Sequence, residues 1–409
     1  MAKKPLYKKI FRLIRDIIFI ILLKPIWKRI IKKIKTDKVC KKLIEESHKS
    51  GKPVVIYVSH FDYYSHLQQR PNHMFNILAS KGYPCVFCSY RKKYTNPIPN
   101  MHVIPISWLN YILKVKCKKV FDVPFNYPYR DIPDLFKYIN DEALVIYELI
   151  DDFDLLATPK IINQAKEVFK RLVARDKTFV LASADKLYDI ALNLGAKKSK
   201  LISSKNAVNF DDFNKTDTSI PESMQKIINK KKPIIGYYGA LTATWFDFDL
   251  MFELVKKHPE YEVVLIGLIY PDENIEKTKE YIDELKQYDN FTYIPPVNYK
   301  EIPNYAKCWD VATIPFQIND ITLSTSPVKL FEYMAMGLPI VTTPMPECKL
   351  YKSVFIAKDI KEFEEKIKTA ISKKEDEKYK KLLHKEALEN TWEQRVNDFV
   401  KIIEDNHKG

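Results

Sequence analysis

Glycine is scarce in this sequence, with 8 among 409 residues, so each glycine at a turn is more informative than usual. No short-period repeat runs along the chain, which argues against a repeat architecture. Hydrophobic residues make up 46% of the chain, a fraction that excludes a disordered protein. The length and apolar content together suit two domains, each with its own core.

Long hydrophobic runs are also lacking near the N-terminus. The longest apolar run there, residues 17–23, spans seven residues, whereas a helix that crosses a bilayer needs about 20. Arg15, Asp16 and Lys24 flank this run, and Pro25 is expected to kink a helix. No small-residue cleavage site follows, so we do not expect a secretory signal peptide.

Positive charge is concentrated at the start of the chain. The first 42 residues hold 15 of the 67 basic residues and two of the 52 acidic ones, which leaves 52 basic and 50 acidic residues elsewhere. A nucleic-acid-binding protein would carry its basic surface on the folded domain, so we expect no nucleic-acid partner. The basic, apolar segment 6–34, with Trp27 near one end, instead predicts a helix lying on an anionic membrane surface. The alternative is an ordinary helix packed on the protein's own surface.

Six cysteines are present, and none is expected to bind a metal. Cys85 and Cys88 occupy positions i and i+3 of a predicted strand, so their side chains point to opposite faces. No second cysteine pair completes a zinc site. Reduced, buried thiols in a cytoplasmic protein explain this pattern.

Short apolar segments alternate with helical segments from residue 53 onward, and the pattern restarts after a polar linker near residue 215. This alternation predicts an α/β protein with two Rossmann-like domains and parallel sheets. We expect a basic leader at 1–50, an acceptor domain at 51–214, a donor domain at 215–385 and a final segment at 386–409. The predicted strands are 53–59, 84–90, 101–107, 143–149, 178–183, 200–208, 234–240, 261–267, 291–297, 310–316, 340–343 and 353–359.

One stretch of the second half, LSTSPVKLFEYMAMGLPIVTT at 323–343, carries clear helix signals. Ser326 is a good N-cap residue and Pro327 a good first residue, so we expect a helix from Pro327 to Met336. Gly337 supplies the left-handed stop. The helix should begin beyond the carboxyl end of a buried strand, where open α/β sheets bind their ligands.

Lys329 and Glu332 lie on the same face of this predicted helix. Free N–H groups and the helix dipole attract a phosphate, and Lys329 adds a full charge. The Glu332 carboxylate can accept hydrogen bonds from two hydroxyls, as a ribose offers them. Gly239, after an earlier strand, lets the backbone approach a phosphate without a Cβ clash. One helix end can thus hold a diphosphate and a sugar; the alternative is a surface ion pair.

The stretch STSPVKLFEYMAMGLPIVTTPMPE resembles the donor-nucleotide motif of GT-B glycosyltransferases, in the broad family 1 and family 4 group. IGYYGALTATWFDFDLMFELVKKHPEYEVVLIG resembles the start of their donor domain. SHFDYYSHLQQRPNHMFNILASKGYPCVF resembles the N-terminal start of members that build bacterial exopolysaccharides and teichuronic-type polymers. NTWEQRVNDF resembles their last helix, which returns toward the N-terminal domain. The resemblance implies that the donor is held by Ser324, Thr325, Ser326, Lys329 and Glu332, and Gly239 joins this predicted site on the physical argument above.

The resemblance covers residues 53–400 and implies a glycosyltransferase, and the interfacial helix expected at 6–34 would place it on the cytoplasmic face of the plasma membrane. It would move a sugar from a nucleotide-diphosphate donor to a lipid-linked or polysaccharide acceptor in cell-surface glycan synthesis. Asp-Phe-Asp occurs at 152–154 and 247–249, but neither copy has the context of a metal site, so no cofactor or obligatory metal is expected. Many relatives carry a glutamate at the Ser324 position. The rival function is therefore a non-catalytic scaffold with this fold in a glycan-assembly complex.

Glycosyl transfer needs a base for the acceptor hydroxyl or electrostatic support for the leaving diphosphate. Asp152, at the end of a predicted strand, is the first candidate base. Asp151 is adjacent, so only one of the two is expected to point inward. His60 and Asp62, after the first strand, are the rival candidates. Arg70 is predicted to hold a phosphate of the donor or the acceptor.

Overall fold

The computed structural model describes residues 24–58, 62–64, 68–89, 93–127, 134–156, 158–215 and 219–407. Its N-terminal domain is built on a seven-stranded sheet in the order β3-β2-β1-β4-β5-β6-β7, and every strand pair is parallel. The strands are β1 (Val54–Tyr57), β2 (Cys85–Ser89), β3 (Met101–Pro105), β4 (Lys119–Pro124), β5 (Leu144–Leu149), β6 (Thr178–Ala182) and β7 (Leu201–Ser203).

Two hydrophobic cores cover the two faces of this sheet, because successive side chains of a strand point to opposite faces. In β1, Ile56 packs into one core and Val55 into the other. The first core is closed by α2 (Lys24–Ser50), α4 (Leu109–Ile112), α5 (Pro159–Val173) and α6 (Asp185–Asn193). The second core is closed by α3 (Arg70–Ser80) and α16 (Trp392–His407).

The C-terminal domain repeats this topology. Its six-stranded parallel sheet has the order β10-β9-β8-β11-β12-β13. The strands are β8 (Ile234–Tyr238), β9 (Glu262–Ile266), β10 (Phe291–Ile294), β11 (Val311–Ile314), β12 (Ile340–Thr342) and β13 (Val354–Ile356). The helices are α7 (Phe210–Phe213), α8 (Glu222–Ile228), α9 (Phe248–Lys257), α10 (Ile275–Leu285), α11 (Ile302–Ala306), α12 (Asp320–Leu323), α13 (Val328–Ala335), α14 (Ile360–Ile371) and α15 (Glu377–Leu388).

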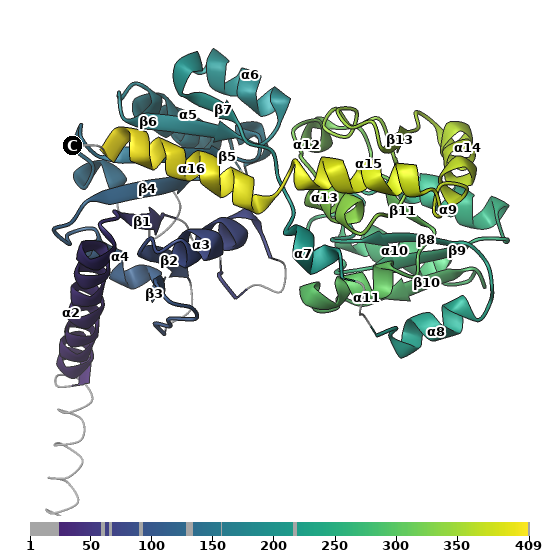
Figure 1. Cartoon of the computed structure of the whole chain (residues 1–409), viewed down its shortest axis with the longest axis horizontal. Helices are drawn as coiled ribbons and strands as arrows, with labels where there is room; N and C mark the ends of the chain where they lie inside the picture. The colour runs from purple at the N-terminus through teal and green to yellow at the C-terminus, as the bar shows by residue number, and fades with distance from the viewer. Residues whose placement is uncertain are drawn as a thin grey trace, which may run out of the picture.

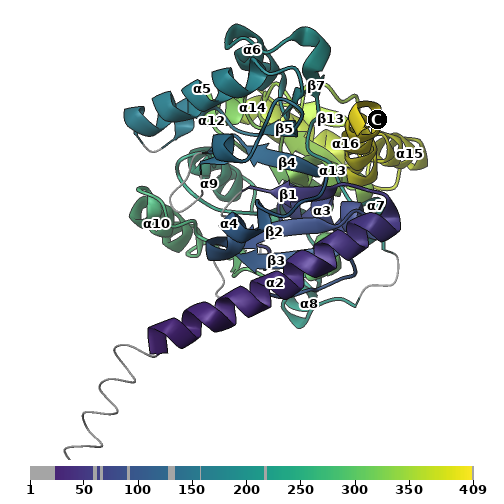
Figure 2. The ribbon, with the colours of Figure 1, turned by 90° about the vertical axis from the view of Figure 1, so that its left-hand side faces the viewer.

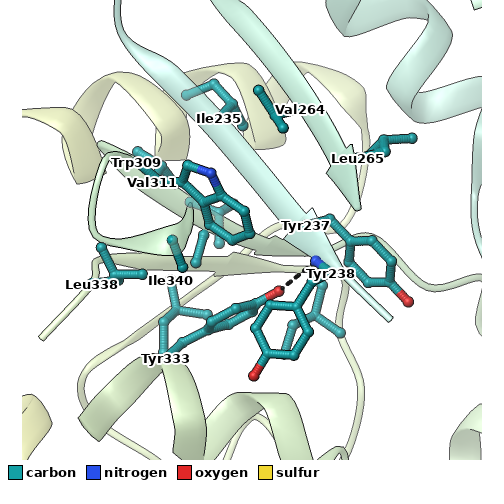
Figure 3. Packing of buried hydrophobic residues seen from close by; sticks show 14 of the residues in the cluster. Ile235, Tyr237, Tyr238, Val264, Leu265, Trp309, Val311, Tyr333, Leu338 and Ile340 are labelled. Carbon is teal, nitrogen blue, oxygen red and sulfur yellow. Dashed lines mark hydrogen bonds between the residues drawn. The ribbon is translucent and has the colours of Figure 1, made fainter. Parts of the chain in front are cut away.

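Large aromatic side chains fill the centre of this second domain. Tyr237, Trp309 and Tyr333 are completely buried. The Tyr333 hydroxyl accepts a hydrogen bond from the backbone N–H of Tyr238, in β8, at 3.2 Å (Figure 3). This contact ties α13 to the end of β8, the two elements on which the predicted donor site depends.

The last helix leaves the second domain and packs on the first, as Figure 1 shows for α16. Trp392, Val396 and Phe399 belong to the same buried cluster as residues of α3 and β1. The prediction of an α/β protein with two Rossmann-like domains is confirmed. Strand β4 is an addition to the predicted set.

Helix α2 crosses in front of the N-terminal sheet in Figure 2. Val39 and Leu43, in its second half, are buried in the first core. In its first half, by contrast, five apolar side chains are 44–55% exposed: Ile26, Trp27, Ile30, Ile31 and Ile34. Residues 1–23 of the predicted leader lie outside the described residues. Within the described residues, no helix combines the length and apolar content needed to cross a bilayer.

Candidate active site

The helix that carries the predicted donor residues is α13, and it begins one residue later than predicted. Pro327 is its N-cap residue, and Gly337, with φ +68°, follows its end as expected. The prediction that Ser326 caps the helix is wrong. Its hydroxyl accepts a hydrogen bond from the backbone N–H of Asn206 at 3.2 Å, and its carbonyl accepts one from the Asn206 amide at 2.7 Å. Ser326 therefore joins the donor helix to the segment that leaves the first domain.

Lys329 and Gly239 lie side by side at the carboxyl edge of the second sheet. A Cβ atom built on Gly239, whose φ is +145°, would lie 2.9 Å from Lys329 Cε and 3.3 Å from its Nζ. The ammonium lies 5.4 Å from the ring centre of Tyr237 and 5.0 Å from that of Phe316. Gly267 approaches from the next strand, where a Cβ atom would lie 1.8 Å from the Gly239 carbonyl oxygen. Only glycine allows this close packing of loops around the lysine.

The Lys329 ammonium has no hydrogen-bond or ion-pair partner in the described part of the chain. Burial lowers its pKa to about 8. The nearby aromatic faces attract a cation without neutralising it. The arrangement leaves a single positive charge at a sheet edge, where an anion would restore its pairing.

Glu332 is satisfied inside its own domain. Its carboxylate accepts hydrogen bonds from the hydroxyls of Tyr238 and Tyr299, and the residue is 2% exposed. Burial raises the pKa of Glu332, while the two tyrosines and Lys329 act to lower it. Two phenolic hydroxyls thus take the acceptor positions that the sequence assigns to a ribose. Sequence analysis missed both tyrosines.

The two hydroxyl residues before Ser326 make local contacts. Ser324 donates to the backbone carbonyl of Asp320 at 3.0 Å, and Thr325 donates to that of Ile321 at 2.7 Å. Both hydroxyls are engaged in the turn that ends α12, a common use of serine and threonine at i−4. Contact of Ser324 and Thr325 with the donor stays a prediction.

Arg70 serves the interior of the first domain. Its Nε lies 2.7 Å from Glu148 Oε2, and its other two nitrogens donate to the Ser204 hydroxyl and to the carbonyls of Ser204 and Lys205. The residue is 4% exposed. All three guanidinium nitrogens therefore have protein partners, and the phosphate contact of Arg70 stays a prediction. Arg70 connects the start of α3 to β5 and to the segment after β7.

Asp152 and Asp151 lie near the contact between the domains. The Asp152 carboxylate accepts a hydrogen bond from the backbone N–H of Asp154 at 3.1 Å and lies 3.5 Å from Lys186 Nζ. Lys186 in turn lies 3.8 Å from Asp320 of the second domain. Burial, together with the charge of Asp152, raises the pKa of Asp151 to about 7. Of the pair, Asp151 has the ionisation suited to proton transfer near neutral pH.

Asp62, the other described candidate base, accepts hydrogen bonds from the Tyr64 backbone N–H and the Ser89 hydroxyl, both at 3.1 Å. It therefore shapes the loop that follows β1. His60 lies outside the described residues. Neither observation tests the predicted catalytic role of these two residues.

An acid that sequence analysis missed lies in β4. Asp122 is 2% exposed, and its Oδ1 has no hydrogen-bond partner among the described residues. Burial and the nearby Glu148 carboxylate raise the pKa of Asp122 well above its usual range. The only signal in the sequence is one aspartate within the apolar run Val120–Val123. The described residues include no group of three or more His, Cys, Asp and Glu side chains placed to hold a metal.

The GT-B fold is defined by two domains with parallel, Rossmann-like sheets and by a final helix that returns from the second domain to the first. Solved structures agree with this assignment. A glycosyltransferase from Rickettsia africae superposes with a TM-score of 0.65 at 16% identity, over 88% of this chain and 99% of the other. Sucrose-phosphate synthase from Thermosynechococcus elongatus gives 0.65 at 12% identity, over 87% and 98%. Anabaena HepE in complex with UDP gives 0.61 at 12% identity, over 87% and 100%.

Residues 219–387 match the family model described as glycosyl transferases group 1. A curated relative, the proposed teichuronic acid biosynthesis glycosyltransferase TuaH of Bacillus subtilis (strain 168), is 22% identical over 239 residues. That match spans 57% of this chain and 57% of the relative, little more than half of its length. The chain therefore has the GT-B fold, and its second domain belongs to the group 1 glycosyl transferases.

Proposed function

We propose that the chain is a glycosyltransferase that moves a sugar from a nucleoside-diphosphate sugar to a lipid-linked or polysaccharide acceptor of the cell surface. The family of the second domain supports glycosyl transfer. Structures of HepE with UDP and with UDP-glucose support a nucleotide-sugar donor. The name of the Bacillus subtilis relative supports an acceptor in cell-surface polymer synthesis.

The observation that carries the proposal is the ammonium of Lys329 beside Gly239, which has no hydrogen-bond or ion-pair partner among the described residues. A diphosphate placed at this edge would pair with Lys329 and with free N–H groups at the start of α13. The same contacts would stabilise the diphosphate as it leaves, because its charge develops during the reaction. We assign the donor phosphates to this place.

The catalytic base that accepts the proton of the acceptor hydroxyl belongs to the first domain, across the domain contact from the donor site. Asp151 and Asp152 follow β5 at its carboxyl end, and the Asp152–Lys186 pair reaches Asp320 of the donor domain. We keep Asp152 as a candidate and add Asp151 because its pKa of about 7 suits a base near neutral pH. Activity of a chain that uses Asp151 should rise as the pH passes through 7.

The first half of α2 is the proposed membrane contact. Ile26, Ile30 and Ile34 are four residues apart and form one exposed line along the helix. Ile30 and Val39 are separated by about two and a half turns, which places them on opposite faces. Because Val39 is buried against the domain, the exposed line points away from the protein body. This geometry of residues 26–34 supports the predicted membrane attachment over packing on the protein's own surface, and with it a position on the inner leaflet.

The test is transfer of labelled sugar from a panel of nucleotide sugars, UDP-glucose included, to a membrane extract. We expect label in the lipid or polymer fraction, and at least tenfold less with Lys329→Met. Turnover should persist after EDTA treatment, because no metal is expected. Activity that disappears with EDTA and returns with a divalent cation would contradict that last expectation.

A non-catalytic scaffold with the same fold is the second candidate function. The observation that favours it is Ser324 at the position where many relatives carry a glutamate, since its hydroxyl is engaged with Asp320. A chain that binds nucleotide sugars but turns none of them over with membrane extract would support the scaffold and reject the enzyme.

A further inference from the structure

A basic pocket lies at the opposite end of the N-terminal sheet from the proposed active site. It has a volume of about 580 Å³ and is formed where β4, β5 and β6 begin. Four lysines line it against one glutamate: Lys118, Lys119, Lys137, Lys177 and Glu142. A volume of this size suits a small ligand or a lipid headgroup, and the excess of positive charge indicates an anionic one.

The lysines of the pocket differ in how they are engaged. Lys177 pairs with Glu142 at 2.5 Å. Lys119 donates to the backbone carbonyls of Val115 and Cys117, and burial lowers its pKa. Lys118 and Lys137 are exposed at the rim. Both side chains are therefore accessible from solvent at the mouth of the pocket.

The short helix α4 connects the pocket to the half of α2 that carries the exposed apolar line. Tyr138, in the pocket wall, donates its hydroxyl to Asn110 of α4 at 2.8 Å. The ammonium of Lys32, in α2, lies over the ring of the neighbouring Tyr111, 5.5 Å from the ring centre. Cys117 of the pocket and Cys40 of α2 also pack against the same core. The apolar line and the basic pocket therefore belong to one flank of the first domain.

We propose that this pocket binds the phosphate headgroup of an anionic membrane lipid while the apolar line of α2 enters the interface. The inference rests on the membrane attachment given under Proposed function. One apolar helix gives weak attachment, and a second, electrostatic contact makes it stable. Each lysine near an anionic surface contributes about 1 kcal/mol. The pocket would add lipid selectivity, which the helix by itself does not supply.

The test is sedimentation of the full chain with vesicles of phosphatidylcholine alone or of phosphatidylcholine with about 30% phosphatidylglycerol. The anionic lipid gives the vesicles the negative surface charge that attracts basic segments. We compare the wild type, Lys118→Gln/Lys137→Gln and the matched control Lys160→Gln/Lys198→Gln, two exposed lysines elsewhere on the same domain. The pocket variant should lose at least tenfold in partition onto the anionic vesicles. The control variant removes the same net charge from outside the pocket, so its partition onto the anionic vesicles should stay within about twofold of the wild type.

Equal losses in the two double variants would overturn the proposal, because general charge would then explain the binding. Binding of glycerol 1-phosphate by calorimetry, with unchanged vesicle binding of the pocket variant, would also overturn it in favour of a free anion. If the double variant fails to fold, the single variant Lys137→Glu replaces it and should also lose binding to the anionic vesicles. Ile30→Ser/Ile31→Ser should weaken binding to both vesicle types. Turnover of nucleotide sugar, measured on the same samples, fails separately if the enzyme proposal is wrong.

Discussion

The two sheets have nearly the same strand order, yet the cations at their carboxyl edges are used differently. Arg70 of the first domain is surrounded by acceptors: Glu148, the Ser204 hydroxyl and two carbonyls. Lys329 of the second domain lies against two aromatic rings with no acceptor among the described residues. Both are placed where α/β sheets bind ligands. The partners decide whether such a cation is structural or functional.

The anions at the two edges follow the same distinction. Glu332 and Glu148 each accept hydrogen bonds inside their own domains. Asp151 accepts no such hydrogen bonds from the described residues, and its pKa of about 7 suits proton exchange near neutral pH. Residues with satisfied contacts maintain the fold, while those that lack partners are the candidates for chemistry.

The largest effect is expected from Arg70→Leu. Removing the guanidinium leaves Glu148 buried without its partner and beside the buried Asp122, which should cost about 3–5 kcal/mol of unfolding free energy. Urea denaturation followed by circular dichroism measures it. Arg70→Leu/Glu148→Leu should recover part of the loss. A single variant as stable as the wild type would place Arg70 among the functional residues after all.

Glu332→Ala should lower stability by about 1–3 kcal/mol, because the buried hydroxyls of Tyr238 and Tyr299 lose their acceptor. Glu332→Gln keeps an acceptor oxygen and should cost less. The measurement is the unfolding midpoint without nucleotide. If Glu332→Ala weakens nucleotide binding but leaves the midpoint unchanged, then the carboxylate serves the donor and not the tyrosines.

Acid should loosen the junction between the domains through His73. Its ring stacks on Trp392 at 5.0 Å and lies 5.8 Å from Tyr299 of the second domain. Burial lowers the His73 pKa to about 4, against a partial opposing effect of Asp212. The unfolded chain therefore takes up the proton first, and stability falls as the pH drops from 6.5 toward 4.

This loss should amount to roughly 1–2 kcal/mol between pH 7 and pH 5. His73→Phe keeps an aromatic ring on Trp392 and should remove that part of the pH dependence. Thermal unfolding at the two pH values compares the variant with the wild type. An identical pH dependence in both chains would show that other groups titrate in this range.

The sequence predicted most of the fold because its strands are apolar segments separated by helical ones. Strand β4 was missed, since Asp122 and the prolines after it interrupt the pattern. Lys329 could be expected beside Gly239, because β8 ends and α13 begins at the same edge of the second sheet. A Cβ atom built on Gly239 would lie 2.9 Å from Lys329 Cε, so the two residues do lie together.

The remaining parts of the site depend on partners that are distant in the sequence. Arg70 and Glu148 are 78 residues apart, and Ser326 and Asn206 are 120 apart. Local patterns predict caps and faces of helices, but they carry no information about such pairings. For the same reason the two tyrosines on Glu332 could not be predicted, although the helix that carries Glu332 could.

The central claim is that Lys329 holds the donor phosphates, and calorimetric titration with UDP at pH 7 and pH 9 tests it most directly. Lys329→Met should bind UDP at least tenfold more weakly than the wild type, a loss of about 1.4 kcal/mol. The control Lys256→Met, which changes an exposed lysine, should bind UDP as tightly as the wild type. Wild-type affinity should fall between the two pH values, because the Lys329 pKa of about 8 lies between them. The Lys329→Met affinity should not change with pH. Equal affinity of Lys329→Met and wild type at pH 7 would contradict the account.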